Sequence, residues 1–126
     1  MSDQQTTLGQ MRDLVRRFVA ARDWERFHAP KNLSMALAIE AAELMEHFQW
    51  LSVEASRRIG DDPEKRTAVG EELADVLCYA LALANELDLD VSQIMRDKMQ
   101  KNERKYPADE YRGRYGPEEP GDSEAV

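Results

Sequence analysis

The sequence predicts an all-α domain built from four main helices. Apolar residues recur at helical spacing along most of the chain, and no alternating strand pattern of useful length is present. Residues that favour helix ends separate these periodic segments. With 126 residues, the chain is long enough for one hydrophobic core and short for two. We therefore expect one helical bundle over residues 1–107, followed by a disordered acidic tail over residues 108–126.

The first helix is predicted from about Thr7 to Arg22, with Thr6 or Thr7 as its N-cap. Its apolar side chains follow helical spacing: Leu8, Met11, Leu14, Val15 and Phe18. The segment DWERFHAPKN then interrupts the pattern because Pro30 disfavours helical backbone at the residue before it.

The second helix is expected from about Leu33 to Leu51, with Asn32 as its cap. It is apolar on two faces, a front stripe of Leu33, Leu37, Ala41, Leu44, Phe48 and Leu51 and a rear face of Met35, Ile39 and Ala42. A small bundle can cover one stripe of each helix but hardly two faces. We therefore expect subunit pairing through the rear face, giving a dimer or a dimer of dimers.

The third helix is predicted from Pro63 to about Leu87, with Asp62 as N-cap. Proline suits the first helical position, because an N–H there would have no partner within the helix. The connector SVEASRRIGDD before it leaves room for a short helical turn. Asp90 with Gln93 three residues later resembles a capping box, which opens a fourth helix to about Tyr106. The proline that follows ends this helix.

Net charge and hydropathy exclude several classes of function. The formal net charge of −8 repels phosphate backbones, which disfavours DNA or RNA polymers as partners. A small polyphosphate remains compatible, because a metal ion held by carboxylates inverts the local potential. The sequence contains no run of about 18 apolar residues, so no membrane span is predicted. The N-terminus MSDQQTTLGQMRDL lacks the basic and apolar regions of a secretory signal, so we expect a cytoplasmic protein.

The single cysteine, Cys78, has no partner for an internal disulfide. It falls within an apolar helical pattern, which is typical of a small buried thiol.

Acidic side chains occupy one narrow sector of each central helix. Glu40 and Glu43 lie three residues apart in the second predicted helix, with His47 in the same sector. Glu72 and Asp75 repeat this spacing in the third helix. Because the surroundings on both helices are apolar, these four carboxylates are candidates to converge.

An unpaired carboxylate in apolar surroundings is costly or takes up a proton, so a buried group of four needs a compensating charge. In the simplest alternative, each acid points to solvent or pairs with a Lys or Arg. A basic cluster is disfavoured, since neither helix carries Lys or Arg in that sector. Two acidic pairs on mostly buried helices favour the third interpretation, in which the carboxylates bind a divalent cation. Oxygen ligands without Cys select Mg²⁺, with Mn²⁺ as a substitute, over zinc.

A di-iron carboxylate bundle is the rival metal site. It requires two E-x-x-H pairs, and the chain offers one, Glu25 to His28, in a loop-like segment beside Pro30.

The fourth predicted helix supplies positive charge. Lys98, Asn102 and Lys105 or Tyr106 recur at helical spacing on one face, where they can bind the phosphates of a metal-bound substrate. The alternative is a solvated basic face that complements the helix dipole. Trp24 and Trp50 flank the second helix and are candidates to stack on a base, or else are core residues.

These motifs together resemble a known family. EAAE at Glu40 and Glu43, followed by EELAD at Glu72 and Asp75, matches the E-x-x-E and E-x-x-D pair of the MazG-like all-α nucleoside triphosphate pyrophosphatases. The segments DWERFHAPKNL, HFQW, DVLCYALAL and KMQKNERKYP occur in the order seen in the dCTP pyrophosphatase branch. The resemblance covers the chain from about Met11 to Pro107.

The resemblance implies a four-helix MazG-like bundle that forms dimers or tetramers. It implies that the four carboxylates hold Mg²⁺ and that Lys98 and Asn102 contact phosphates and sugar. Trp24 and Trp50 match the tryptophans that enclose the pyrimidine, and Tyr79 matches a tyrosine after the second motif.

The chain departs from this branch in one place, because Val15 stands where the branch can carry a base-contacting histidine. His28 is a candidate to compensate.

We therefore predict a Mg²⁺-dependent house-cleaning enzyme that hydrolyses dCTP, or a 5-modified dCTP, to the monophosphate and pyrophosphate. Glu43 is the candidate base for water, and Lys98 is expected to stabilise the leaving pyrophosphate. Two alternatives stay open, a broad or differently specific NTP pyrophosphatase and a non-catalytic helical interaction module.

Overall fold

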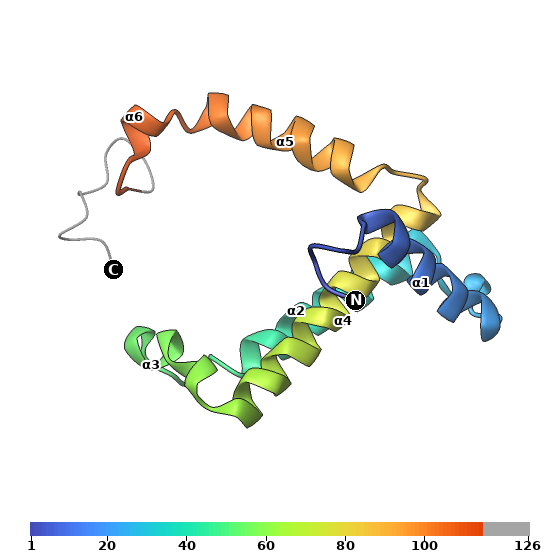
Figure 1. The fold of residues 1–126 in the computed structure, drawn as a ribbon, viewed down its shortest axis with the longest axis horizontal. Helices are drawn as coiled ribbons and strands as arrows, with labels where there is room; N and C mark the ends of the chain where they lie inside the picture. The colour runs from blue at the N-terminus through green and yellow to red at the C-terminus, as the bar shows by residue number, and fades with distance from the viewer. Residues whose placement is uncertain (115–126) are drawn as a thin grey trace. The chain divides into compact units, whose positions relative to one another are not determined.

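The computed structural model describes residues 1–114 and shows only helices joined by turns in that range (Figure 1). The main helices are α1 (Leu8–Ala21), α2 (Pro30–Glu46), α4 (Pro63–Glu86) and α5 (Val91–Lys105). Short helices lie between and after them: η1 (Glu25–Phe27), α3 (Val53–Arg57), η2 (Ile59–Asp61) and α6 (Ala108–Tyr111). The predicted all-α class is confirmed. No helix of residues 1–114 combines the length and apolar character that a membrane crossing requires.

Side-chain caps begin three of the main helices where the sequence predicts. The Thr7 hydroxyl accepts from the Gln10 N–H at 3.1 Å and the Gln10 side chain accepts from the Thr7 N–H at 2.8 Å, which completes a capping box at α1. Asp62 caps α4. Asp90 caps α5 by accepting from the Gln93 N–H at 2.9 Å. The Gln93 side chain instead donates to Asp97, so the predicted box at α5 is only half formed.

The predicted boundaries of α2 are wrong at both ends. The helix begins at Pro30, with Ala29 at the N-cap, because proline fits the first helical position. Asn32 lies inside the helix and donates to the Phe27 carbonyl rather than capping. The helix ends at Glu46, and residues 47–50 form turns.

Two further differences concern the short elements. The predicted turn in the connector is present as α3 and η2. The helix α6 lies within the predicted tail, where the Tyr111 ring meets the Tyr106 ring edge-on with centroids 5.1 Å apart. The rest of that tail, residues 115–126, lies outside the described residues.

The chain divides into two units, residues 1–89 and the part that begins at Asp90. In the first unit α2 and α4 pack side by side, and α1 packs on α4 (Figure 1). The buried apolar residues of this unit are few: Val19, Leu33, Ala82 and Ala84.

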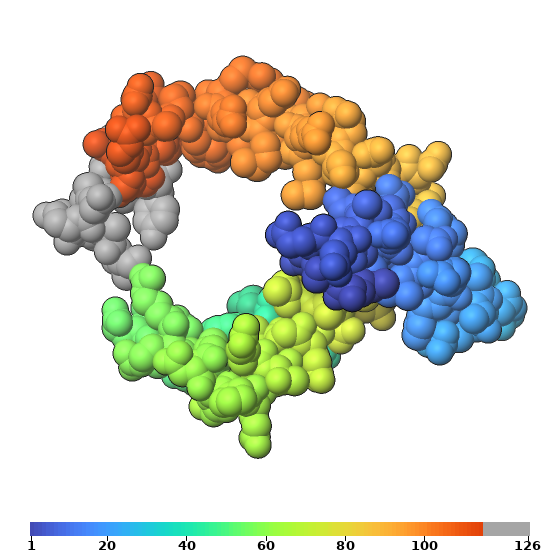
Figure 2. Space-filling model, in the orientation of Figure 1, coloured from blue at the N-terminus to red at the C-terminus, as the bar shows by residue number. Residues whose placement is uncertain are grey.

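Large apolar side chains stay at the surface of the first unit. On the rear of α2, Met35 is 54% exposed and Ile39 is 58% exposed. Leu73 and Leu77 of α4 are likewise exposed, and the space-filling view shows the yellow-green first part of α4 at the surface (Figure 2). Within residues 1–89 the rear face of α2 is therefore uncovered, and the predicted pairing through it stays a prediction.

Candidate active site

Three carboxylates from two helices meet in the first unit. Glu40 and Glu43 lie on the face of α2 that packs against α4, and Glu72 lies on α4. One carboxylate oxygen from each comes within 4.8 Å of the other two, and all three side chains are half-buried. The i, i+3 spacing places two acids on one helix face, and packing of the two apolar surfaces brings the third to them.

Asp75 lies one turn beyond Glu72 on α4 and is exposed. It is not among the three grouped carboxylates, yet its charge reaches Glu40. The predicted group of four is thus a cluster of three, the carboxylate cluster, with Asp75 at its edge.

The carboxylate cluster changes the protonation of Glu40. The pKa of Glu40 is raised from 4.5 to about 7, and hydrogen bonding with Glu43 is the largest cause. The smaller causes of the same rise are desolvation, the charge of Glu43, hydrogen bonding with Glu72 and the charge of Asp75. Crowded negative charges in a partly dry site hold a proton because the ionised form is disfavoured.

Two oxygens of the cluster have no donor. Oε2 of Glu40 and Oε2 of Glu72 are buried, and no group of residues 1–114 donates a hydrogen bond to either. The ion pairs within that range involve Asp13 and Asp109 instead, so no Lys or Arg neutralises the cluster there. Ionised carboxylates donate nothing to one another, so a proton or a cation must satisfy these oxygens. An all-oxygen donor set with two unsatisfied oxygens fits a hard divalent cation.

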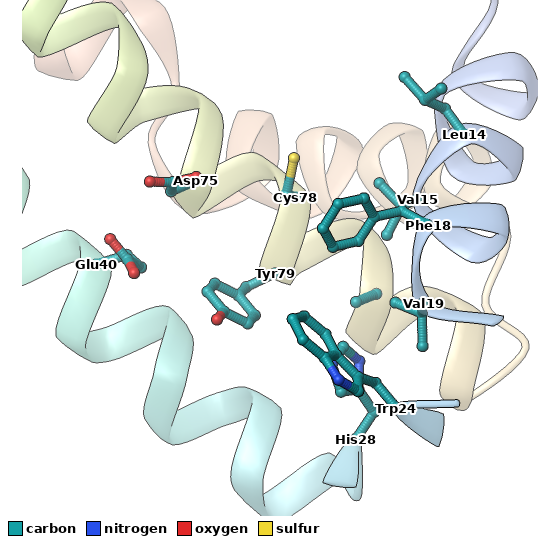
Figure 3. Close-up of a pocket in the computed structure, with 11 residues that line it drawn as sticks. Leu14, Val15, Phe18, Val19, Trp24, His28, Glu40, Asp75, Cys78 and Tyr79 are labelled. Atoms are coloured by element: carbon teal, nitrogen blue, oxygen red, sulfur yellow. The ribbon is translucent and has the colours of Figure 1, made fainter. Parts of the chain in front are cut away.

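A pocket of about 450 Å³ begins beside this cluster. Glu40 of α2 and Asp75 of α4 lie at one end, and Trp24 and His28 lie at the other (Figure 3). Tyr79 of α4 lies between the two ends (Figure 3). The remaining wall is mainly apolar and comes from α1 and α4: Leu14, Val15, Phe18, Val19, Cys78 and Ala82. The pocket therefore joins an acidic end to an aromatic end.

The end of α1 fixes the position of Trp24. Asp23 adopts a left-handed conformation with φ of 53°, and the Trp24 N–H bonds back to the Val19 carbonyl at 3.1 Å. This turn directs the indole onto the Phe18 ring, edge-on with centroids 5.8 Å apart. The Arg22 guanidinium lies 3.6 Å from the Phe18 ring centre and adds a cation–π contact.

Comparisons with known proteins place the chain in a family. The model of the MazG-like family matches residues 35–115. The chain belongs to the MazG-like family. This MazG-like chain is also similar to the crystal structure of a pyrophosphatase from Archaeoglobus fulgidus, with a TM-score of 0.74 and 39% identity, covering 79% of this chain and 92% of that one.

Curated relatives of this MazG-like chain carry the name dCTP pyrophosphatase 1. The Bos taurus protein is 44% identical over 107 residues, which is 85% of this chain and 63% of the relative. The Homo sapiens protein is 45% identical over 102 residues, 81% of this chain and 60% of the relative. The chain thus spans less than two thirds of the length of these relatives.

The MazG-like chain brings only some of the predicted substrate residues to the pocket. Trp24, His28 and Tyr79 line it. Trp50 does not, because it lies beyond the end of α2 and is 88% exposed. A helix of 17 residues is about 25 Å long, so Trp24 and Trp50 stand at opposite ends of α2.

The other predicted residues belong to the second unit, and three of them, Lys98, Asn102 and Lys105, lie on α5. Asn102 is half-buried and contacts the Met99 sulfur at 3.8 Å. Tyr106 follows the helix as its C-cap, with the Lys105 ammonium 5.2 Å from its ring centre. Their roles in binding stay predictions.

Sequence reasoning found only part of the α1 wall of the pocket. It placed Val15 where a base-contacting residue can stand, and it noted only the helical spacing of Leu14 and Phe18, which are exposed and line the pocket as well. Helical spacing shows that residues share a face but does not show whether that face meets protein or a cavity.

The prediction of a buried Cys78 is also wrong. The thiol is exposed and lines the pocket. Partial desolvation, and then the charge of Asp75, raise the pKa of Cys78, so the reactive thiolate is disfavoured.

Proposed function

We propose that this chain is a Mg²⁺-dependent nucleoside triphosphate pyrophosphatase, with dCTP or a 5-modified dCTP as its preferred substrate. The observation that carries the proposal is the carboxylate cluster, with two unsatisfied oxygens, at the acidic end of an aromatic-walled pocket. A base can stack at the aromatic end while its phosphates lie at the acidic end. The names of the relatives, dCTP pyrophosphatase 1 and a pyrophosphatase, support this substrate and reaction.

Glu40, Glu43, Glu72 and Asp75 would hold the ion. When bound, a divalent cation supplies charge neutralisation and polarisation of the reacting phosphoryl group. Mg²⁺ is the first choice because every donor in the cluster is an oxygen, with Mn²⁺ as a substitute. The single E-x-x-H pair, Glu25 with His28, lies apart from the cluster, so the di-iron alternative gains no support.

In the proposed reaction the oxygen of water attacks the α-phosphorus and the bond from that phosphorus to the bridging oxygen breaks. Pyrophosphate leaves and the nucleoside monophosphate remains. Glu43 takes the proton of the attacking water, and Lys98 stabilises the negative charge of the leaving group. Asn102, Lys105 and Tyr106 are proposed to contact phosphates and sugar, on the strength of the sequence resemblance alone.

Trp24, Tyr79 and His28 are proposed to hold the base and sugar. All three line the pocket, and Trp24 offers an indole face at its aromatic end. Base stacking on an aromatic ring is worth about 1–3 kcal/mol and tolerates any base. Val15 makes the α1 wall apolar where a base-specific donor would be useful. A broader NTP pyrophosphatase is therefore the second candidate function.

We also propose that the working form is a homodimer or homotetramer. The exposed rear of α2 gives an apolar surface for a second copy. The position of Trp50 also supports an oligomer, because Trp50 and Trp24 of the same chain lie at opposite ends of α2. If both tryptophans enclose one base, Trp50 comes from a neighbouring copy. House-cleaning of nucleotide pools in the cytoplasm is the role that we assign to this assembly.

The test is an assay of the purified chain with Mg²⁺ and each canonical and several 5-modified NTPs, followed by separation of the products. Monophosphate plus pyrophosphate, with the dCTP group turned over fastest, is the expected result. Equal turnover of all bases would favour the broader enzyme. Diphosphate plus inorganic phosphate would contradict the position of cleavage. If the chain turns over no nucleotide, and Mg²⁺ with a non-hydrolysable analogue does not raise its melting temperature, the non-catalytic interaction module is the better interpretation.

A further inference from the structure

Asn85, near the end of α4, joins α4 to α1 by hydrogen bonds of its side chain. Its Oδ1 accepts from Arg12 Nε at 3.0 Å and from an Arg16 guanidinium nitrogen at 3.1 Å. Its Nδ2 donates to the Arg12 carbonyl at 3.1 Å. Arg12 also donates to the Ala84 carbonyl at 3.3 Å. We call this set of four hydrogen bonds the Asn85 clamp.

The clamp requires both halves of an amide. The oxygen accepts from two cations and the nitrogen donates to a main-chain carbonyl, so a carboxylate or an alkyl group cannot replace it. Three of the four bonds are partly buried. Bonds to charged donors in partly dry surroundings are stronger than neutral bonds in water.

The rest of the contact between α1 and α4 is weak. Val19 is the one buried residue of α1, whereas Leu14 and Phe18 are about half exposed. The ion pairs of Asp13 with Arg16 and Arg17 stay within α1. Among residues 1–114, the side-chain hydrogen bonds between α1 and α4 are those of the clamp. Among residues 1–114, the clamp is therefore the polar link between the side chains of α1 and α4.

The clamp adjoins the substrate pocket. A second cavity of about 270 Å³ is lined by Arg16 and Asn85. It shares Val15, Val19, His28 and Ala82 with the large pocket. Val15 and Ala82 each lie one helical turn from a member of the clamp, so a change in helix separation at the clamp changes the width of the pocket between these walls.

We infer that Asn85 is a positioning residue that sets the width of the aromatic end of the pocket by holding α1 on α4. This inference rests on the proposed function, in which that end of the pocket receives the base. Asn85 touches neither the carboxylate cluster nor the pocket's acidic end. Loss of the clamp should therefore weaken nucleotide binding while the chemical step stays intact.

Two substitutions in the full chain test this inference. Asn85→Leu removes every bond of the side chain, and Asn85→Asp keeps the acceptor for both arginines while losing the donor to the Arg12 carbonyl. For Asn85→Leu we expect KM to rise about tenfold, the factor that corresponds to one lost bond of a charged group, with kcat nearly unchanged. Asn85→Asp should give a smaller rise. Arg17→Gln, which breaks only the ion pair with Asp13 inside α1, is the matched control and should change neither constant.

Hydrogen exchange of the α1 amides, measured without nucleotide, tests the clamp independently of activity. Faster exchange over residues 8–21 in Asn85→Leu, together with the rise in KM and an unchanged Mn²⁺ affinity, supports the inference. Unchanged exchange overturns it, as does faster exchange with an unchanged KM. If the wild-type chain neither hydrolyses nor binds any nucleotide, the proposed function fails and the positioning role fails with it, even where exchange responds.

Discussion

Glu40 on α2 and Glu72 on α4 each bury a carboxylate oxygen, Oε2, that receives no hydrogen bond from residues 1–114. The two helices that carry these residues pack directly against one another. Such an arrangement is costly unless a proton or a cation satisfies both oxygens.

Replacing Glu43 by glutamine should lower kcat by about 10²–10⁴-fold, the usual contribution of a positioned general base. The helical circular dichroism signal should not change, because the substitution preserves shape. Glu46→Gln on the exposed side of α2 is the control and should keep full activity. Wild-type turnover in Glu43→Gln would remove this residue from the mechanism.

Mg²⁺ should raise the melting temperature of the wild-type chain, and a chelator should reverse the effect, since an ion that binds only the folded state stabilises it. Glu72→Gln should lose most of this shift because it removes one of the two unsatisfied oxygens. Glu71→Gln, at the exposed neighbouring position, should retain it. Equal shifts in the two variants would show that the ion binds elsewhere. The melting temperatures are measured by thermal denaturation with and without Mg²⁺.

The metal-free chain should lose stability as pH rises from about 4.5 to about 7. The pKa of Glu40 is raised in the folded state, so folding takes up a proton over this range. The stabilising contribution is complete below the unfolded pKa and is lost as pH passes through the folded pKa. Glu40→Gln should flatten the profile of melting temperature against pH in chelator. An identical slope in wild type and variant would contradict the protonation of Glu40.

Trp24→Ala should raise KM roughly 5- to 150-fold, because stacking of one base on an aromatic ring is worth about 1–3 kcal/mol. Trp24→Phe should recover most of the loss, since it restores an aromatic face. Steady-state kinetics on dCTP at fixed Mg²⁺ give both values. If the alanine and phenylalanine variants bind equally well, stacking is not the function of this side chain.

Ile39→Glu should shift the chain to smaller species in sedimentation velocity experiments. The substitution places a charge on the rear face of α2, where burial by a second copy would make it costly. Gln5→Glu adds the same charge near the N-terminus and is the control. A monomeric wild type at micromolar concentration would refute pairing through this face.

Local sequence signals were sufficient for most of the helix ends. Thr7, Asp62 and Asp90 cap α1, α4 and α5 where predicted, because each cap bonds to backbone within three residues. The start of α2 was less clear, since Pro30 can either precede a helix or occupy its first position. No local sequence pattern predicted the contact between the rings of Tyr106 and Tyr111, and α6, which carries Tyr111, was not predicted.

We could predict the helical class, the family, and the paired acids on one face of each of two helices from the order of the amino acids. Those properties depend on spacing along the chain, which a periodic helix converts directly into direction. Tertiary packing alone decided that Glu40, Glu43 and Glu72 form the cluster while Asp75 lies at its edge, and that α1 forms a pocket wall. It also decided that Trp50 stands far from Trp24. Distances between helices depend on which side chains interlock across them, and one-dimensional periodicity carries no such information.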